Sequence, residues 1–169
     1  TSYIPTNGSV VTRAQETCVD ATPTINSEEG VLYAEISALT DIHTNTEFIS
    51  ITDGLYTRNS VYIQLRSSSN RLAIWSYSNN VNQLAEVFTL TDITEFNKIA
   101  ISYKSNEFKV YINGVNVFTE LSYNAPTLDS LDRLDFGRDG ILPFDGNTKD
   151  LKIYDKALTD EELTELTTI

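Results

Sequence analysis

Acidic residues near the end of the chain are the first candidates for chemistry. Segment 144–163, FDGNTKDLKIYDKALTDEEL, is crowded with carboxylates, and Ca²⁺ prefers oxygen ligands of this kind. Asp139, Asp145 and Asp150 lie close together in sequence but lack EF-hand spacing. The first two each precede a glycine, and Asp-Gly is also an ordinary turn signal. We therefore expect a structural calcium at Asp139, Asp145 and Asp150 or, as the alternative, turns that lead into the last strand.

Catalytic candidates are few. His43 is the only histidine and stands in a polar, loop-like segment, while Cys18 is the only cysteine and cannot form an internal disulfide. A lone cysteine is usually a small buried hydrophobe. Glu35 is a single acid within a strand-like run, whereas glycoside hydrolysis needs two carboxylates on one surface. We expect no catalytic residue, and Glu35 remains either a sheet-face residue or a ligand contact.

Region 56–82 carries a signal for sugar binding. Sugar rings stack on aromatic faces, and their hydroxyls bond planar polar groups. Two-residue alternation places Trp75 and Tyr77 on one strand face and Tyr62 on a neighbouring face that is shown to solvent. The predicted ligand residues are Tyr62, Gln64, Arg66, Trp75, Tyr77, Asn79 and Glu35. A lone tryptophan in a sandwich is also commonly part of the core, and that alternative stays open at this point.

The elements that must position these residues are short strands. Apolar residues recur with a period of two between turn signals, which is typical of an antiparallel β-sandwich. The expected strands cover 30–37, 47–51, 60–66, 71–78, 97–104, 107–114, the segment after Gly114, 131–137 and 149–155. Asn79, Asn80 and Asn82 are expected in a loop. One helix is predicted at the end, where Thr159 and Glu162 form a capping box.

Composition limits the partners. The chain has 169 residues with a net charge of -12 and no methionine. The charge opposes a phosphate backbone, so we expect no nucleic-acid binding, and no apolar run is long enough for a membrane span. The missing methionine suggests a domain of a longer or processed polypeptide. We predict a linker over 1–20 that leads into a single sandwich domain over 21–169.

Two blocks carry a resemblance. NKIAISYKSNEFKVYINGVNVF looks like the paired-strand signature of laminin-G-like, concanavalin A-like jelly-roll domains, and LDFGRDG…FDGNTKDLKIYDKALTDEEL resembles their closing segment. The resemblance implies an all-β jelly roll with a short C-terminal helix, in a family that contains enzymes and binding modules. The Glu-x-Asp-x-x-Glu strand of its hydrolase members is absent here, as are the strand motifs of its lyases.

A narrower resemblance concerns SYIPTNGSVVTRAQETC, EGVLYAEIS and FISITDG, which are similar to modules of bacteriophage tail and tail-fibre proteins. It implies a virion or extracellular surface location, further domains in the same polypeptide and a homo-oligomeric fibre. We expect a non-catalytic module that binds a surface glycan. A structural domain that packs against other virion domains is the alternative, and a carbohydrate-active enzyme is the third hypothesis.

Overall fold

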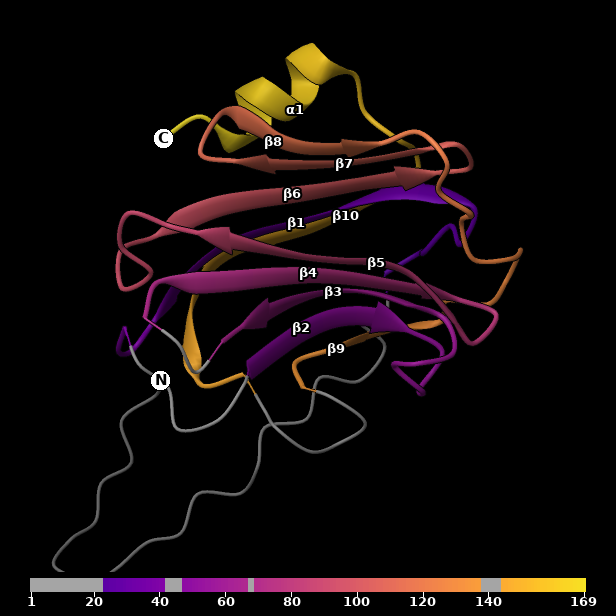
Figure 1. Cartoon of the computed structure of the whole chain (residues 1–169), viewed down its shortest axis with the longest axis horizontal. Helices are drawn as coiled ribbons and strands as arrows, with labels where there is room; N and C mark the ends of the chain where they lie inside the picture. The colour runs from indigo at the N-terminus through magenta and orange to yellow at the C-terminus, as the bar shows by residue number, and fades with distance from the viewer. Residues whose placement is uncertain (1–22, 42–46, 67–68, 138–143) are drawn as a thin grey trace, which may run out of the picture.

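The computed structural model describes residues 23–41, 47–66, 69–137 and 144–169. Two five-stranded antiparallel sheets lie face to face (Figure 1). Sheet A has the order β10-β1-β6-β7-β8, and sheet B has the order β5-β4-β3-β2-β9. This arrangement confirms the predicted jelly-roll β-sandwich with one short C-terminal helix. The proposed linker 1–20, together with Cys18, His43 and Asp139, lies outside the described residues.

The strand bounds follow the alternating runs of the sequence. Sheet A contains β1 (Glu29–Ala38), β6 (Asn97–Lys104), β7 (Glu107–Ile112), β8 (Val115–Glu120) and β10 (Gly146–Tyr154). Sheet B contains β2 (Glu47–Thr52), β3 (Ser60–Leu65), β4 (Arg71–Ser78), β5 (Val81–Thr89) and β9 (Arg133–Asp135). The β6–β7 hairpin closes at Ser105-Asn106 as predicted, because Lys104 pairs with Glu107 and Asn106 adopts a positive φ of 64°.

The main core lies between the two sheets. Alternate residues of the central strands point inward, among them Ile36 of β1, Ile63 of β3 and Ile74 of β4, which are almost completely buried. The inward positions predicted for the β6–β7 hairpin are also confirmed: Ile99, Ile101, Phe108, Val110 and Ile112. Burial of these apolar side chains is the largest stabilising contribution to such a sandwich.

One strand was not predicted. β5 covers Val81–Thr89, where the sequence suggested a loop containing Asn82. Asn79 and Asn80 have positive φ values of 51° and 64°, so they form a two-residue hairpin turn that feeds directly into β5. β5 is the edge strand of sheet B; Leu84 and Phe88 pack on the core, whereas Ala85 and Val87 are exposed. Because apolar residues stand on both faces, the sequence of β5 lacks a clear apolar–polar alternation. β9 is shorter than predicted and β10 starts earlier.

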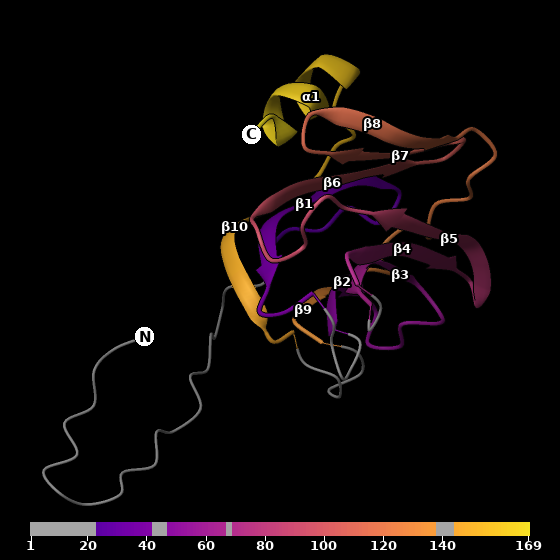
Figure 2. The same cartoon turned by 60° about the vertical axis from the view of Figure 1, so that its left-hand side comes forward.

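Helix α1 (Asp160–Thr167) covers the outer side of sheet A (Figure 2). Its capping box is formed as predicted: the Thr159 hydroxyl accepts from the Glu162 amide, and the Glu162 carboxylate accepts from the Thr159 amide. Leu163 is fully buried against Tyr33 and Tyr111, so the helix seals a second, smaller core. Among the described residues, no helix is long and apolar enough to cross a membrane.

Candidate functional site

Five aromatic rings gather on the outer face of sheet B, the side that faces away from the main core. We call this group the aromatic face; it consists of Phe48, Tyr56, Tyr62, Trp75 and Tyr77. β3 and β4 supply three of the rings because Tyr62, Trp75 and Tyr77 alternate with inward residues such as Ile63 and Ile74. Trp75 therefore lies outside the core, and the core alternative for it is wrong.

The rings pack in a continuous row. Tyr62 and Trp75 are cross-strand partners, and their rings are nearly parallel at 11° with centroids 6.2 Å apart, an offset stack. Phe48 packs against Tyr62 at 5.6 Å, and Tyr56 bridges Tyr62 and Tyr77 at 6.0 Å and 6.3 Å. Strand pairing positions the rings of β3 and β4, and ring contacts hold the loop residue Tyr56 against them.

Burial divides this row into a hidden part and an accessible part. Tyr62 is only 3% exposed and Gln64 only 9%, so the prediction that both are shown to solvent is wrong. The physical reason for Tyr62 is that Phe48, Tyr56 and Trp75 surround it. Trp75 and Tyr77 remain half-exposed, and these two rings are the accessible ones that β4 supplies.

A hydrogen bond fixes the indole of Trp75. Its Nε1 donates to Oε1 of Gln64 at 2.9 Å, which sets the orientation of both side chains. In the described part of the chain, the Gln64 amide nitrogen has no acceptor and keeps two free N–H groups. On the side away from Tyr62, the cross-strand partner of Trp75 is Ala85, an exposed methyl. The indole therefore has one face stacked on Tyr62 and one flank beside a small residue.

The end of the aromatic face near Tyr77 is braced by polar contacts. Asn79 lies in the hairpin turn, and its amide donates to Oδ1 of Asn59 at 2.8 Å. Asn59 in turn donates to Oδ2 of Asp53 at 2.9 Å, and Arg58 forms an ion pair with the same carboxylate. Burial alone would raise the pKa of Asp53, but donors from Arg58, Asn59 and the Leu55 amide outweigh it and lower that pKa.

Two predicted ligand residues lie apart from the rings. Arg66 follows β3 at the opposite end of the strand from Tyr77 and is half-buried. Glu35 lies on β1 of sheet A, is 8% exposed and receives a hydrogen bond from Nζ of Lys149 at 2.6 Å. Glu35 therefore belongs to the outer face of the other sheet, and its assignment to the same ligand surface is wrong.

The predicted calcium ligands do not meet in the described residues. Asp145 is exposed just before β10, whereas Asp150 lies within β10 and forms an ion pair with Lys152. Asp150 lies five residues after Asp145 along extended chain, a span of roughly 16 Å, which is too far for one ion to bind both. No group of three metal-ligating side chains occurs in the described part of the chain. Calcium held with Asp139 stays a prediction.

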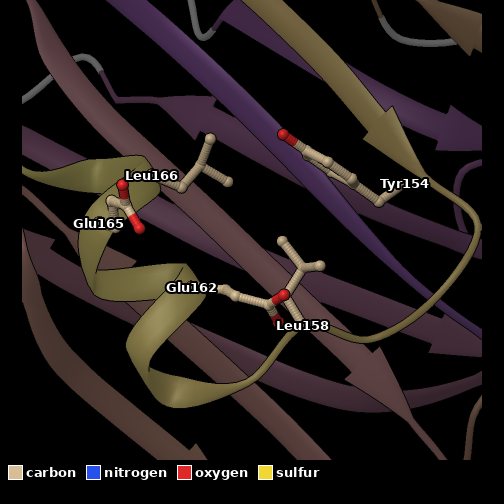
Figure 3. A pocket seen from close by; sticks show the side chains of 5 residues that line it. All are labelled: Tyr154, Leu158, Glu162, Glu165 and Leu166. Carbon is tan, nitrogen blue, oxygen red and sulfur yellow. The ribbon is translucent and has the colours of Figure 1, made fainter.

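A hollow lies between α1 and the end of β10, away from the aromatic face. Its volume is about 340 Å³, and it is lined by Tyr154, Leu158, Glu162, Glu165 and Leu166 (Figure 3). Glu162 already binds the Thr159 amide through Oε2, and the remaining floor is largely apolar. The lining side chains offer few donors for sugar hydroxyls. This hollow suits a sugar less well than the aromatic face does.

Sequence reasoning missed three members of the site. Phe48 alternates with the inward residues of β2, so its outward position could have been found from the period of two. Tyr56 stands in a loop, and nothing in the sequence indicates that its ring reaches Tyr62. Ala85 is recognisable only once β5 is known to pair with β4.

The fold is shared with binding domains of known structure. The CBM40 domain of the Ruminococcus gnavus IT-sialidase, bound to α2,3-sialyllactose, aligns with a TM-score of 0.66 and 14% identity over 84% of this chain and 83% of that chain. Domain 4 of AbnA, an extracellular GH43 arabinanase from Geobacillus stearothermophilus in complex with arabinotriose, aligns with a TM-score of 0.60 and 20% identity over 86% and 68%. At these identities the likeness shows the fold alone.

A toxin domain has the same fold. The binding domain of botulinum neurotoxin serotype D/C aligns with a TM-score of 0.60 and 14% identity over 83% of this chain and 36% of that chain. No curated protein matches the sequence. The model of the concanavalin A-like lectin/glucanases superfamily, a laminin-G-type family, matches residues 36–164. With most of its length matched, the chain belongs to the concanavalin A-like lectin/glucanases superfamily.

Proposed function

We propose that this domain is a non-catalytic carbohydrate-binding module that recognises glycans on a cell surface. The observation that carries the proposal is the half-exposed indole of Trp75, held by Gln64, stacked on Tyr62 and flanked by Ala85. A fixed aromatic ring with an open flank suits stacking against a pyranose ring. Gln64 itself is buried and acts by fixing the orientation of the indole.

Relatives of the same fold support a binding role. The CBM40 domain is bound to sialyllactose and the arabinanase domain to arabinotriose. The outer positions of the β3–β4 hairpin carry no carboxylate, and glycoside hydrolysis needs a pair of them. These observations favour binding over catalysis.

The wider setting of the proposal is a phage tail or tail-fibre type of protein, located on the virion or at an extracellular surface. Its support is the resemblance of the first segments of the sequence to such modules. In a homo-oligomeric fibre, weak binding by each copy would add up through avidity. Other domains of the same polypeptide would then be the structural partners.

A structural role in such an assembly is the second candidate. The edge strand β8 and the residue after it expose three apolar side chains, Val115 at 59%, Val117 at 39% and Leu121 at 67%. An edge strand with exposed apolar residues is suited to packing against a neighbouring domain. This surface lies on sheet A, so a structural contact there and a sugar on sheet B are compatible.

The test is a glycan array with the wild-type chain and the variant Trp75→Ala. We expect loss of most binding, because truncation of a tryptophan at the centre of a binding surface typically costs about 2 kcal/mol or more. The matched control is Tyr154→Ala, which removes a half-buried ring from the hollow on sheet A. If folded Trp75→Ala protein, verified by thermal melt, keeps the wild-type array pattern, the proposal is wrong.

A further inference from the structure

The segment that builds the aromatic face has an unusual charge. The chain contains 24 acidic residues among 169, yet Gly54 to Ala85 contains no Asp or Glu. The same segment contains three arginines, Arg58, Arg66 and Arg71. The β3–β4 hairpin is therefore a positively charged element within a chain of net charge -12.

Within the described part of the chain, two of the three arginines form no ion pair or side-chain hydrogen bond. Arg58 pairs with Asp53, as described above. Most other described Lys and Arg side chains bond a carboxylate or a carbonyl, for example Lys149 with Glu35 and Lys98 with the Thr168 carbonyl. Arg66 and Arg71 have no such partner in the described residues. One acid, Asp41, lies beside the loop between the two arginines, where its carboxylate accepts from Ser69 Oγ and its carbonyl from the Asn70 amide. A guanidinium group without a carboxylate partner can bind an external anion.

The two arginines stand next to each other at one end of the hairpin. The amide of Arg66 donates to the carbonyl of Arg71 at 3.0 Å. On β4, Arg71 lies on the same face as Ala73 and Trp75. Arg66 follows Gln64 by two residues, so both arginines belong to the outer face of sheet B. Trp75 lies four residues after Arg71 on β4, a span of about 13 Å.

The accessible groups lie at the two ends of this span. Trp75 lies at one end and the guanidinium groups of Arg66 and Arg71 belong to the other, while the buried Ala73 and Gln64 form the floor between them. Guanidinium groups bind planar oxyanions with two parallel hydrogen bonds. The span exceeds one pyranose ring, so a ligand that touches both ends must be an oligosaccharide.

We infer that the ligand of the aromatic face is an anionic oligosaccharide, whose carboxylate or sulfate is bound by Arg66 and Arg71 while another of its rings stacks at Trp75. The inference rests on the proposed function and names its ligand class. The relatives leave this open, because sialyllactose is charged and arabinotriose is neutral. The assignment follows from the arginines of this chain.

The test uses trisaccharide pairs whose members differ only in charge. The pairs are trigalacturonate with its methyl ester, sialyllactose with its methyl ester, and a sulfated trisaccharide with its desulfated form. Calorimetry on the full chain should give at least one pair in which the anionic member binds about fivefold or more tightly than its neutral twin. This advantage should shrink between low and physiological salt, because the arginines are solvent-accessible. Preference within the carboxylate pairs or the sulfate pair identifies the anionic group.

Variants connect the preference to the two arginines. Arg66→Gln and Arg71→Gln should each lower the affinity for the anionic member about fivefold and leave that for the neutral member unchanged. The control Lys156→Gln makes the same change in net charge at an exposed loop beyond β10 and should change neither affinity. Thermal melts verify that each variant is folded.

The outcomes separate the two proposals. If neutral and anionic members bind equally and Trp75→Ala abolishes both, the glycan-binding function holds and the anionic ligand is wrong. If Lys156→Gln weakens anionic binding as much as the arginine variants do, the preference comes from net charge, and the arginine site is overturned. If no member of any pair binds, this inference is wrong, while the array with Trp75→Ala still decides the function itself.

Discussion

The outer faces of the two sheets are built by the same two-residue alternation of side chains but differ in what covers them. On sheet A, α1 covers Tyr33 and Tyr111 with Leu163, and the neighbouring Glu35 has its own ion pair with Lys149. On sheet B, the rings of the aromatic face pack on one another, Phe48 and Tyr62 are almost completely buried, and Trp75 stays partly exposed. Among the described residues, a helix covers the outer face of sheet A and none covers that of sheet B, where Trp75 and Tyr77 stay partly accessible.

Weakening the packing of α1 on sheet A should give the largest change in stability. It should also show whether the outer face of sheet B works independently of that of sheet A. Leu163→Ala removes the fully buried side chain with which α1 packs on sheet A. It should lower the free energy of unfolding by about 3 kcal/mol. Urea denaturation measures this change. Glycan affinity at a temperature where the variant is folded should stay at the wild-type value. A parallel loss of affinity would show that the two faces are coupled.

Filling the open flank of Trp75 should lower glycan affinity and leave stability nearly unchanged. Ala85→Phe puts a ring beside the indole on the exposed edge strand, where it would compete with a sugar. We expect affinity for the best array ligand to fall about tenfold, which corresponds to about 1.4 kcal/mol, with stability changed by no more than about 0.5 kcal/mol. Ala85→Ser is the control of similar size. Unchanged affinity of the Phe variant would exclude this flank as the contact.

The smallest effect concerns acid stability of the loop beside Tyr56. Since the pKa of Asp53 is lower in the folded protein than its ordinary value of 3.8, its contribution is present above about pH 4. That contribution is lost as the pH falls through the lower, folded-state value. Asp53→Asn should therefore flatten the decline of unfolding free energy below pH 4, measured by urea titrations at several pH values.

The control for this titration is Asp145→Asn, which removes an exposed carboxylate that has no partner in the described residues. Its pH dependence should follow the wild type. The wild-type decline will not vanish in Asp53→Asn, because the pKa values of Glu107 and Asp160 are lowered as well, each chiefly by a hydrogen bond from a lysine. Identical slopes for Asp53→Asn and the wild type would contradict the role of Asp53.

Local signals predicted much of the fold. Alternation gave the faces of β1, β6 and β7, and the capping box at Thr159 gave the start of α1, because both signals depend on residues close in sequence. β5 was missed because apolar residues stand on both of its faces, Leu84 and Phe88 inward and Ala85 and Val87 outward, so its sequence shows no clear alternation. Its hairpin turn was nevertheless present in the sequence as Asn79-Asn80.

The site was less predictable because it depends on contacts between distant segments. Trp75 and Tyr77 share a face as alternation requires, but the burial of Tyr62 results from Phe48 and Tyr56, which other segments contribute. Glu35 was misassigned because the sequence shows which face of a strand a residue occupies and not which sheet the strand joins. Alternation alone therefore cannot tell the outer face of sheet A from the outer face of sheet B.

The hairpin turn at Asn79-Asn80 also has an entropic consequence. The accessible rings Trp75 and Tyr77 stand on a strand paired on both sides, and the turn beyond them is fixed by Asn59. A ligand that docks here orders little that is not already ordered, so little conformational entropy is lost on binding. Free and bound forms of this hairpin should superpose closely, and selectivity should come from the shape of the sugar rather than from adjustment of the protein.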